Sequence, residues 1–94
     1  IRSQKKPGIV LLVTPQDLET QRVEKILQTP QFQTILKDMI LIRVDVTKDP
    51  KIMSRYGIHK TPSLMLYDSK GMMRKKISSM TDVNSMMREF QSLK

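Results

Sequence analysis

A short, fully aliphatic run near the start of the chain constrains the fold more than any other feature of the sequence. Residues 9–13, Ile-Val-Leu-Leu-Val, include no polar side chain, which is typical of a strand covered on both faces. A long stretch with helical patterning separates this run from the next apolar run, 39–46. Two strands joined by such a crossover pair in parallel, with a right-handed connection. The sequence therefore predicts an α/β domain with helices on both faces of a sheet.

Helix-start signals divide the stretch between these runs into two helices. In Thr14-Pro15 the threonine is a candidate N-cap and the proline a candidate first helical residue, and Thr29-Pro30 repeats the pattern. Apolar side chains at helical spacing predict the buried stripe of the first helix: Leu18, Val23, Ile26 and Leu27. The second helix continues this apolar face with Phe32, Ile35 and Leu36.

The second half of the chain alternates short helical and strand patterns. A short helix begins at Asp49-Pro50 and ends at Gly57, because glycine readily adopts the left-handed conformation of a helix C-cap. The remaining predicted elements are a strand at 63–67, a turn at 68–71, a strand at 72–78 and a helix from Thr81-Asp82 that presents Val83, Met86, Met87, Phe90 and Leu93 on one face. The turn predicts an antiparallel hairpin. The predicted order is β-α-α-β-α-β-β-α, with a central mixed sheet of about four strands.

The chain is strongly basic, with a net charge of +8 over 94 residues. Such an excess favours acidic partners, whether nucleic acid, anionic lipid or an acidic protein surface. The densest basic groups are Lys5-Lys6 and Arg74-Lys75-Lys76, and neither is interleaved with aromatic side chains that would stack on bases. On an edge strand, the second group would guard against sheet-to-sheet aggregation. Contact with an acidic partner is the alternative for this group.

The absence of cysteine excludes disulfides, thiolate metal sites and cysteine nucleophiles from this chain. No run of residues is long and apolar enough for a membrane span, and no signal-peptide pattern opens the sequence. We interpret residues 1–6 as a basic tail or linker and residues 7–94 as a single domain. Because the first residue is Ile1, we expect the chain to be a processed or excised piece of a longer protein.

Three segments of the sequence carry a family resemblance: Arg43–Thr47, Tyr56–Leu64 with its Tyr-Gly-Ile-x-x-Thr-Pro motif, and Asp68–Gly71. Together they resemble the second half of a thioredoxin. The resemblance implies a thioredoxin-like three-layer sandwich and a cis peptide bond before Pro62. The stretch 23–36 is similar to part of the C-terminal thioredoxin domain of bacterial transmembrane disulfide reductases. That likeness implies a larger bacterial protein, with a periplasmic or membrane-tethered location.

The sequence departs from this family at the reactive Cys-x-x-Cys. In alignment, those positions fall on Asp17, Leu18, Glu19 and Thr20. A carboxylate at Asp17 suits a helix N-terminus and caps backbone N–H groups, but it cannot exchange disulfides. Glu19 and Thr20 offer no pairing of nucleophile and base. We therefore predict no catalytic residue and no thiol–disulfide oxidoreductase activity.

The loop before Pro62 is the candidate partner-binding site, with residues His59, Lys60, Thr61 and Pro62. In the family this loop offers the backbone of the residue before the proline to an extended substrate, which pairs with it as an added strand. A turn that serves only the fold is the alternative. His59 is the single histidine, and it either contacts a partner or is a solvated loop residue.

The eight methionines raise the possibility of copper(I), which prefers sulfur ligands. The pairs Met72-Met73 and Met86-Met87 lack the repeated Met-x-x-Met spacing and accompanying histidines of such sites. We expect Met65, Met86 and Met87 in the core, and Met72, Met73 and Met80 at an adaptable contact surface. No metal and no cofactor is predicted.

These observations favour a redox-inactive thioredoxin-like domain that acts as a protein-binding or scaffold module, with a protein or an extended peptide as its partner. Two alternatives remain open. One is a basic domain that binds nucleic acid or another polyanion, whose affinity would fall steeply with salt. The other is an enzyme that uses non-thiol chemistry on the same scaffold.

Overall fold

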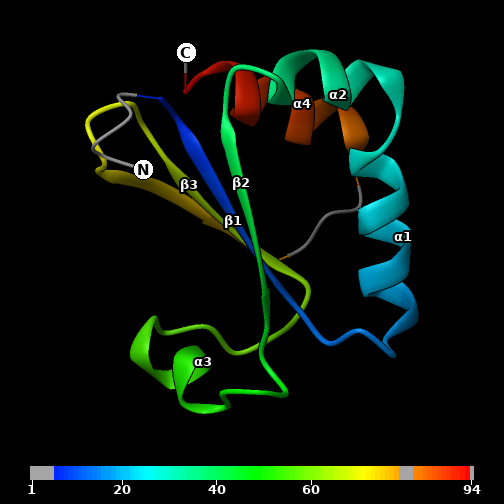
Figure 1. Ribbon diagram of the computed structural model, residues 1–94, viewed down its shortest axis with the longest axis vertical. Coiled ribbons are helices and arrows are strands. Elements are labelled where there is room, and N and C mark those ends of the chain that lie inside the picture. The colour runs from blue at the N-terminus through cyan, green and yellow to red at the C-terminus, as the bar shows by residue number, and fades with distance from the viewer. Residues whose placement is uncertain (1–5, 79–81, 94) are drawn as a thin grey trace.

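A four-stranded mixed sheet forms the centre of the structure, a computed structural model that describes residues 6–78 and 82–93 (Figure 1). The elements are β1 (Gly8–Val13), α1 (Leu18–Leu27), α2 (Pro30–Leu36), β2 (Ile40–Asp45), α3 (Lys51–Arg55), β3 (Ser63–Tyr67), β4 (Met73–Ile77) and α4 (Val83–Gln91). The strand order is β2-β1-β3-β4. Strand β1 pairs in parallel with β2, whereas the β1–β3 and β3–β4 pairs are antiparallel. The predicted element order, crossover and hairpin are confirmed.

Helices α1, α2 and α4 cover one face of the sheet and enclose the larger core. Alternate residues of β1, among them Ile9 and Leu11, point into this core because successive side chains of a strand face opposite sides. The ring of Phe32 in α2 meets the ring of Phe90 in α4 edge to face, with centroids 5.5 Å apart. Both rings are fully buried. Fourteen buried apolar residues of the described chain belong to this cluster.

The other face of the sheet has a much smaller core beneath the short helix α3, which lies on the opposite side of the sheet from α1 (Figure 1). Its buried members in the described residues are Leu12, Val46, Ile58 and Met65. The partly buried side chains of Ile52 and Met53, from α3, pack against them. Helices therefore lie on both faces, as predicted, but they bury very different amounts of apolar surface.

The start of α1 differs from the prediction. Thr14 is not its N-cap and Pro15 is not its first helical residue; instead Thr14–Asp17 forms a turn in which the Asp17 amide donates to the Thr14 carbonyl at 2.9 Å. Asp17 is the N-cap, and its side chain accepts from the Glu19 amide. This delay places Leu18 at the first turn, where its side chain is 79% exposed. The expectation that Leu18 belongs to the buried stripe is therefore wrong.

The two edges of the sheet are protected differently. Strand β4 is an edge strand, and its residues Arg74, Lys75 and Lys76 are exposed, as predicted for a guarded edge. Strand β2, at the other edge, exposes the apolar side chains of Leu41 and Ile42 by 43% and 41%.

The methionines are divided between the core and the surface. Met65 and Met86 are buried, and Met87 is partly buried against the larger core, whereas Met72 and Met73 are exposed. The two core predictions for Met65 and Met86 are therefore confirmed. Met80 and Thr81, and most of the tail at 1–6, lie outside the described residues.

Candidate functional site

The loop from α3 to β3 is held rigidly at both ends. Gly57 ends α3 with a positive φ of 66°, which is the predicted left-handed cap. The amide of Ile58 then donates to the Met53 carbonyl at 2.8 Å, and the Ile58 side chain is buried in the smaller core. At the other end the fully buried Ser63 donates its hydroxyl to the Lys60 carbonyl. Sequence reasoning missed Ser63, because a serine at the first position of a strand gives no sign of the carbonyl that it contacts.

Between these anchors the four predicted partner-binding residues have different environments. His59 and Lys60 are exposed, Thr61 is half-buried and Pro62 is buried. The Thr61–Pro62 peptide bond is cis, as the resemblance implied. Within residues 6–78 and 82–93, no backbone-to-backbone hydrogen bond engages the Thr61 amide or carbonyl. The backbone donor and acceptor of Thr61 therefore have no backbone partner among these residues.

The turn before α1 and this loop meet directly although they are far apart in sequence. The hydroxyls of Thr14 and Thr61 lie 2.8 Å apart and share a hydrogen bond across 47 positions. The Thr14 amide in turn donates to the hydroxyl of the buried Thr20 at 3.4 Å. We name the surface formed by Asp17, Leu18 and residues 59–62 the loop site. Nothing in the spacing of the threonines indicated this contact, which only the folded chain creates.

Of the four positions aligned with Cys-x-x-Cys, three are occupied by local structural contacts. Asp17 accepts a hydrogen bond from the Glu19 amide at 3.4 Å, which confirms its capping role. Glu19 pairs with Arg22 at 3.3 Å, and Thr20 is buried. Leu18 and Glu19 are both exposed, but Glu19 is engaged by Arg22, and a leucine has no group for acid, base or nucleophilic chemistry. These four positions offer an apolar contact and no reactive pair.

A small hollow adjoins the loop site on the side of β4. It has a volume of about 150 Å³ and is lined by residues 57–60, Ser63 and residues 76–78. Lys76 crosses from β4 to donate a hydrogen bond to the Tyr56 carbonyl at the end of α3. Lys60 and Lys76 thus line one concavity, although the sequence places them on separate elements.

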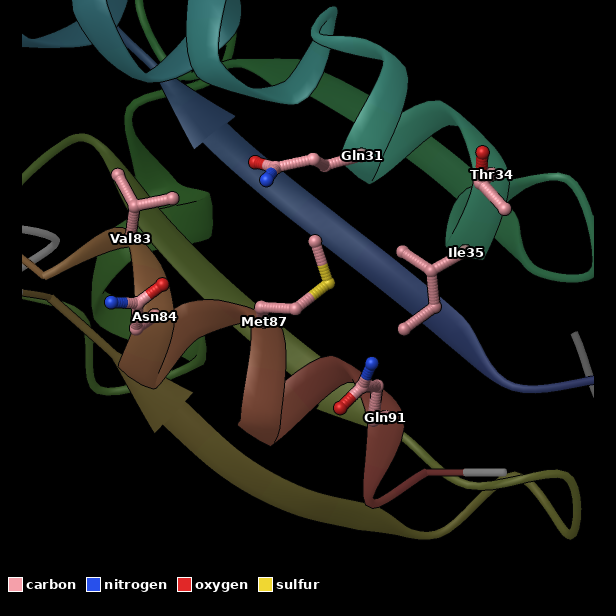
Figure 2. Close-up of a pocket in the computed structure, with 7 residues that line it drawn as sticks. All are labelled: Gln31, Thr34, Ile35, Val83, Asn84, Met87 and Gln91. Atoms are coloured by element: carbon pink, nitrogen blue, oxygen red, sulfur yellow. The ribbon is translucent and has the colours of Figure 1, made fainter.

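A larger groove of about 510 Å³ lies on the far side of the sheet, between α2 and α4. Figure 2 shows the amides of Gln31, Asn84 and Gln91 around the side chain of Met87, which extends between the two helices. Ile35 and Val83 complete its apolar lining. The groove combines amide and apolar groups, and none of the predicted site residues lines it.

Four ionisable groups outside the loop site have shifted pKa values. The hydrogen bond from Thr47 lowers the pKa of Asp45, and the hydrogen bonds from Ser85 and Asn84 lower that of Asp82. The hydrogen bond to Glu24 raises the pKa of Arg43. Burial raises the pKa of Tyr67, whose hydroxyl contacts the Met65 sulfur at 3.9 Å.

Two features of other functional classes are absent from the described parts of the chain. Among residues 6–78 and 82–93, no three histidine or acidic side chains come together as ligands for a metal ion. No helix in the same ranges has the length and apolar character needed to cross a bilayer.

Comparisons with solved structures place the fold. The chain is similar to a thioredoxin from Thermus thermophilus, with a TM-score of 0.83 and 13% identity over 98% of this chain and 76% of that one. It is also similar to a thioredoxin variant from Halobacterium salinarum, with a TM-score of 0.79 and 20% identity over 97% of this chain and 77% of that one. No family model and no curated protein matches the sequence. The fold is thioredoxin-like, and this chain has no cysteine with which to exchange disulfides.

Proposed function

We propose that this chain is a redox-inactive protein-binding domain that holds an extended peptide segment against the loop site. The observation that carries the proposal is an exposed apolar side chain on the same surface as a backbone segment without a backbone hydrogen bond. Leu18 is 79% exposed, and the Thr61 backbone has no backbone partner within the described ranges. The hydrogen bond between Thr14 and Thr61 holds the two halves of this surface together.

The proposed mode of binding is strand addition. A partner in extended conformation would pair with the amide and carbonyl of Thr61, and one of its apolar side chains would cover Leu18. Main-chain hydrogen bonds supply affinity in this mode, and the side-chain contact supplies selectivity. Because Ser63 and Ile58 anchor the loop, binding would cost little ordering of the domain itself.

The wider setting of the domain is part of the proposal. The likeness of residues 23–36 to the bacterial transmembrane disulfide reductases favours a scaffold role within a larger bacterial protein, at a periplasmic or membrane-tethered location. In such a setting the domain would use the architecture of a thioredoxin to hold a partner and would leave disulfide chemistry to other proteins.

A peptide-display selection followed by NMR mapping tests the proposal. Peptides selected on the domain should shift the amide resonances of residues 17–18 and 59–61, and Leu18→Asp should weaken their binding by about tenfold or more. Met72→Asp is the matched control, because Met72 is also apolar and 62% exposed but lies at the hairpin end of β3. Selected peptides that shift other residues, or bind Leu18→Asp as tightly as the native domain, would contradict the proposal.

A further inference from the structure

The positive charge of the domain is neutralised unevenly. The described residues form four ion pairs: Arg22 with Glu19, Arg43 with Glu24, Arg74 with Asp68, and Lys75 with Glu89. None of these pairs involves the basic residues on α3 or beside the loop site. We name these residues the basic cluster: Lys51, Arg55, Lys60 and Lys76, all of them exposed. Residues 48–60 contain a single carboxylate, Asp49.

The register of β4 explains why Lys76 joins this cluster although its neighbour does not. Lys76 pairs with Met65, a residue of the smaller core, so its side chain lies on the α3 face of the sheet. Lys75 points to the opposite face, where its ammonium contacts Glu89 in α4 at 3.0 Å. Because side chains alternate along the strand, Lys75 forms an ion pair with α4 and Lys76 contacts the end of α3.

The hollow beside the loop site concentrates this charge. Lys60 and Lys76 both line it, together with His59, and none of its lining residues is acidic. The Lys76 ammonium has one partner there, the Tyr56 carbonyl, which is a neutral acceptor. Its volume of about 150 Å³ can admit a carboxylate-sized group. An ammonium group in a concave site attracts an anion more strongly than one on a flat surface, because the surrounding protein excludes water.

We infer that the peptide segment held at the loop site is acidic, and that one of its Asp or Glu side chains enters the hollow between Lys60 and Lys76. This inference rests on the proposed function, since it names the chemistry of the segment that the loop site holds. The remaining basic cluster, on α3, would attract further acidic residues of the same partner and speed their association. The affinity for a peptide then depends on the charge of the peptide's side chains as well as on its apolar contact with Leu18.

Three synthetic peptides of equal length, with leucine alternating with Glu, Gln or Lys, test the inference by titration and NMR mapping. At low ionic strength we expect the Glu peptide to bind about tenfold tighter than the Gln peptide, and the Lys peptide to bind weakest. The advantage of the Glu peptide should shrink as salt is added. Lys60→Glu should remove that advantage, whereas Lys70→Glu, an exposed lysine in the hairpin turn, should preserve it.

Lys76→Gln is the second variant, and it should also reduce the advantage of the Glu peptide. Because Lys76 contacts the end of α3, circular dichroism is used to check that this variant is folded. Equal binding of the Glu and Gln peptides at the loop site would overturn the acidic preference and leave the proposed function standing. If neither peptide shifts the amide resonances of residues 17–18 and 59–61, the result would contradict both the acidic preference and the proposed function. A single-stranded oligothymidine that displaces the Glu peptide with a steeper salt dependence would overturn the inference in favour of nucleic acid.

Discussion

The two faces of the sheet differ in how much they bury. On the face covered by α1, α2 and α4, two fully buried phenylalanine rings meet and aliphatic residues from three helices and two strands close around them. On the other face, α3 has only five residues, none of them buried, and the core beneath it is small. Residues 59–62 of the loop site follow directly after Gly57 and Ile58, at the end of α3.

The difference indicates that the two faces contribute unequally to stability, and the proposed binding site lies beside the weaker one. Apolar burial is the main favourable contribution to folding, so the free energy of unfolding depends mostly on the three-helix face. The α3 face contributes less, and in the proposed function its helix and loop would present the basic residues and the Thr61 backbone to a partner. Regions that bind ligands commonly come from the less stable parts of a fold.

The largest loss of stability should come from removing one of the two aromatic rings in the larger core. Phe90→Ala removes a ring that is fully buried against Phe32, and we expect the free energy of unfolding to fall by about 3–5 kcal/mol. Urea denaturation measures this loss. If the alanine variant does not fold, Phe90→Leu keeps the site apolar and should show a smaller loss. A loss below about 1 kcal/mol for Phe90→Ala would mean that this face does not dominate stability.

A smaller loss is expected on the α3 face. Ile58→Ala should lower the free energy of unfolding by about 2 kcal/mol, because the partly buried Ile52 and Met53 beside it can relax into the space. The variant should also increase hydrogen exchange at the Ile58 amide, while exchange in β1 changes little. Ile58→Val is the control and should behave almost as the native chain. A loss that equals that of Phe90→Ala would break the distinction between the faces.

The N-cap of α1 should contribute about 0.5–1 kcal/mol, at the lower part of the range for such caps because its hydrogen bond is long, at 3.4 Å. We therefore expect Asp17→Ala to lower the midpoint of urea unfolding slightly. Asp17→Asn retains an oxygen acceptor and should restore most of the loss. A loss that asparagine does not restore would argue for a role beyond capping.

The smallest effect we expect is a dependence of stability on pH at the N-cap of α4. The hydrogen bonds from Ser85 and Asn84 hold the pKa of Asp82 below its ordinary value of 3.8. The stabilisation is therefore present above that ordinary value and is lost as the pH falls through the native pKa. Unfolding free energies measured across the acidic range should rise with pH less steeply in Asp82→Asn than in the native chain. The exposed Asp49→Asn is the control, and an equal slope in Asp82→Asn and the native chain would exclude the effect.

Much of the architecture could be predicted because it depends on local pattern. The aliphatic run at 9–13, the proline at 30 and the glycine at 57 each restrict the backbone within a few residues of themselves. The predicted strands and helices accordingly agree with the structure to within a few positions. The absence of cysteine likewise excluded thiol chemistry without any reference to coordinates.

The start of α1 shows where local pattern is insufficient. Thr14-Pro15 has the form of a helix start, yet the Thr14 hydroxyl contacts Thr61 across the fold and the helix begins three residues after Pro15. The exposure of Leu18 follows from this delay. Sequence reasoning placed Leu18 in the core because periodicity alone cannot tell which turn of a helix extends beyond the sheet.

The sequence by itself determined the order of the elements, the hairpin, the cap at Asp17 and the absence of a reactive sulfur. Only the tertiary structure decided that Thr14 meets Thr61, that Ser63 holds the Lys60 carbonyl and that Lys60 and Lys76 line one hollow. The physical reason is the distance along the chain over which each interaction acts. Propensity, capping and turn preferences act between near neighbours in the chain, whereas a binding surface is made by residues that the packing of the sheet brings together from distant positions.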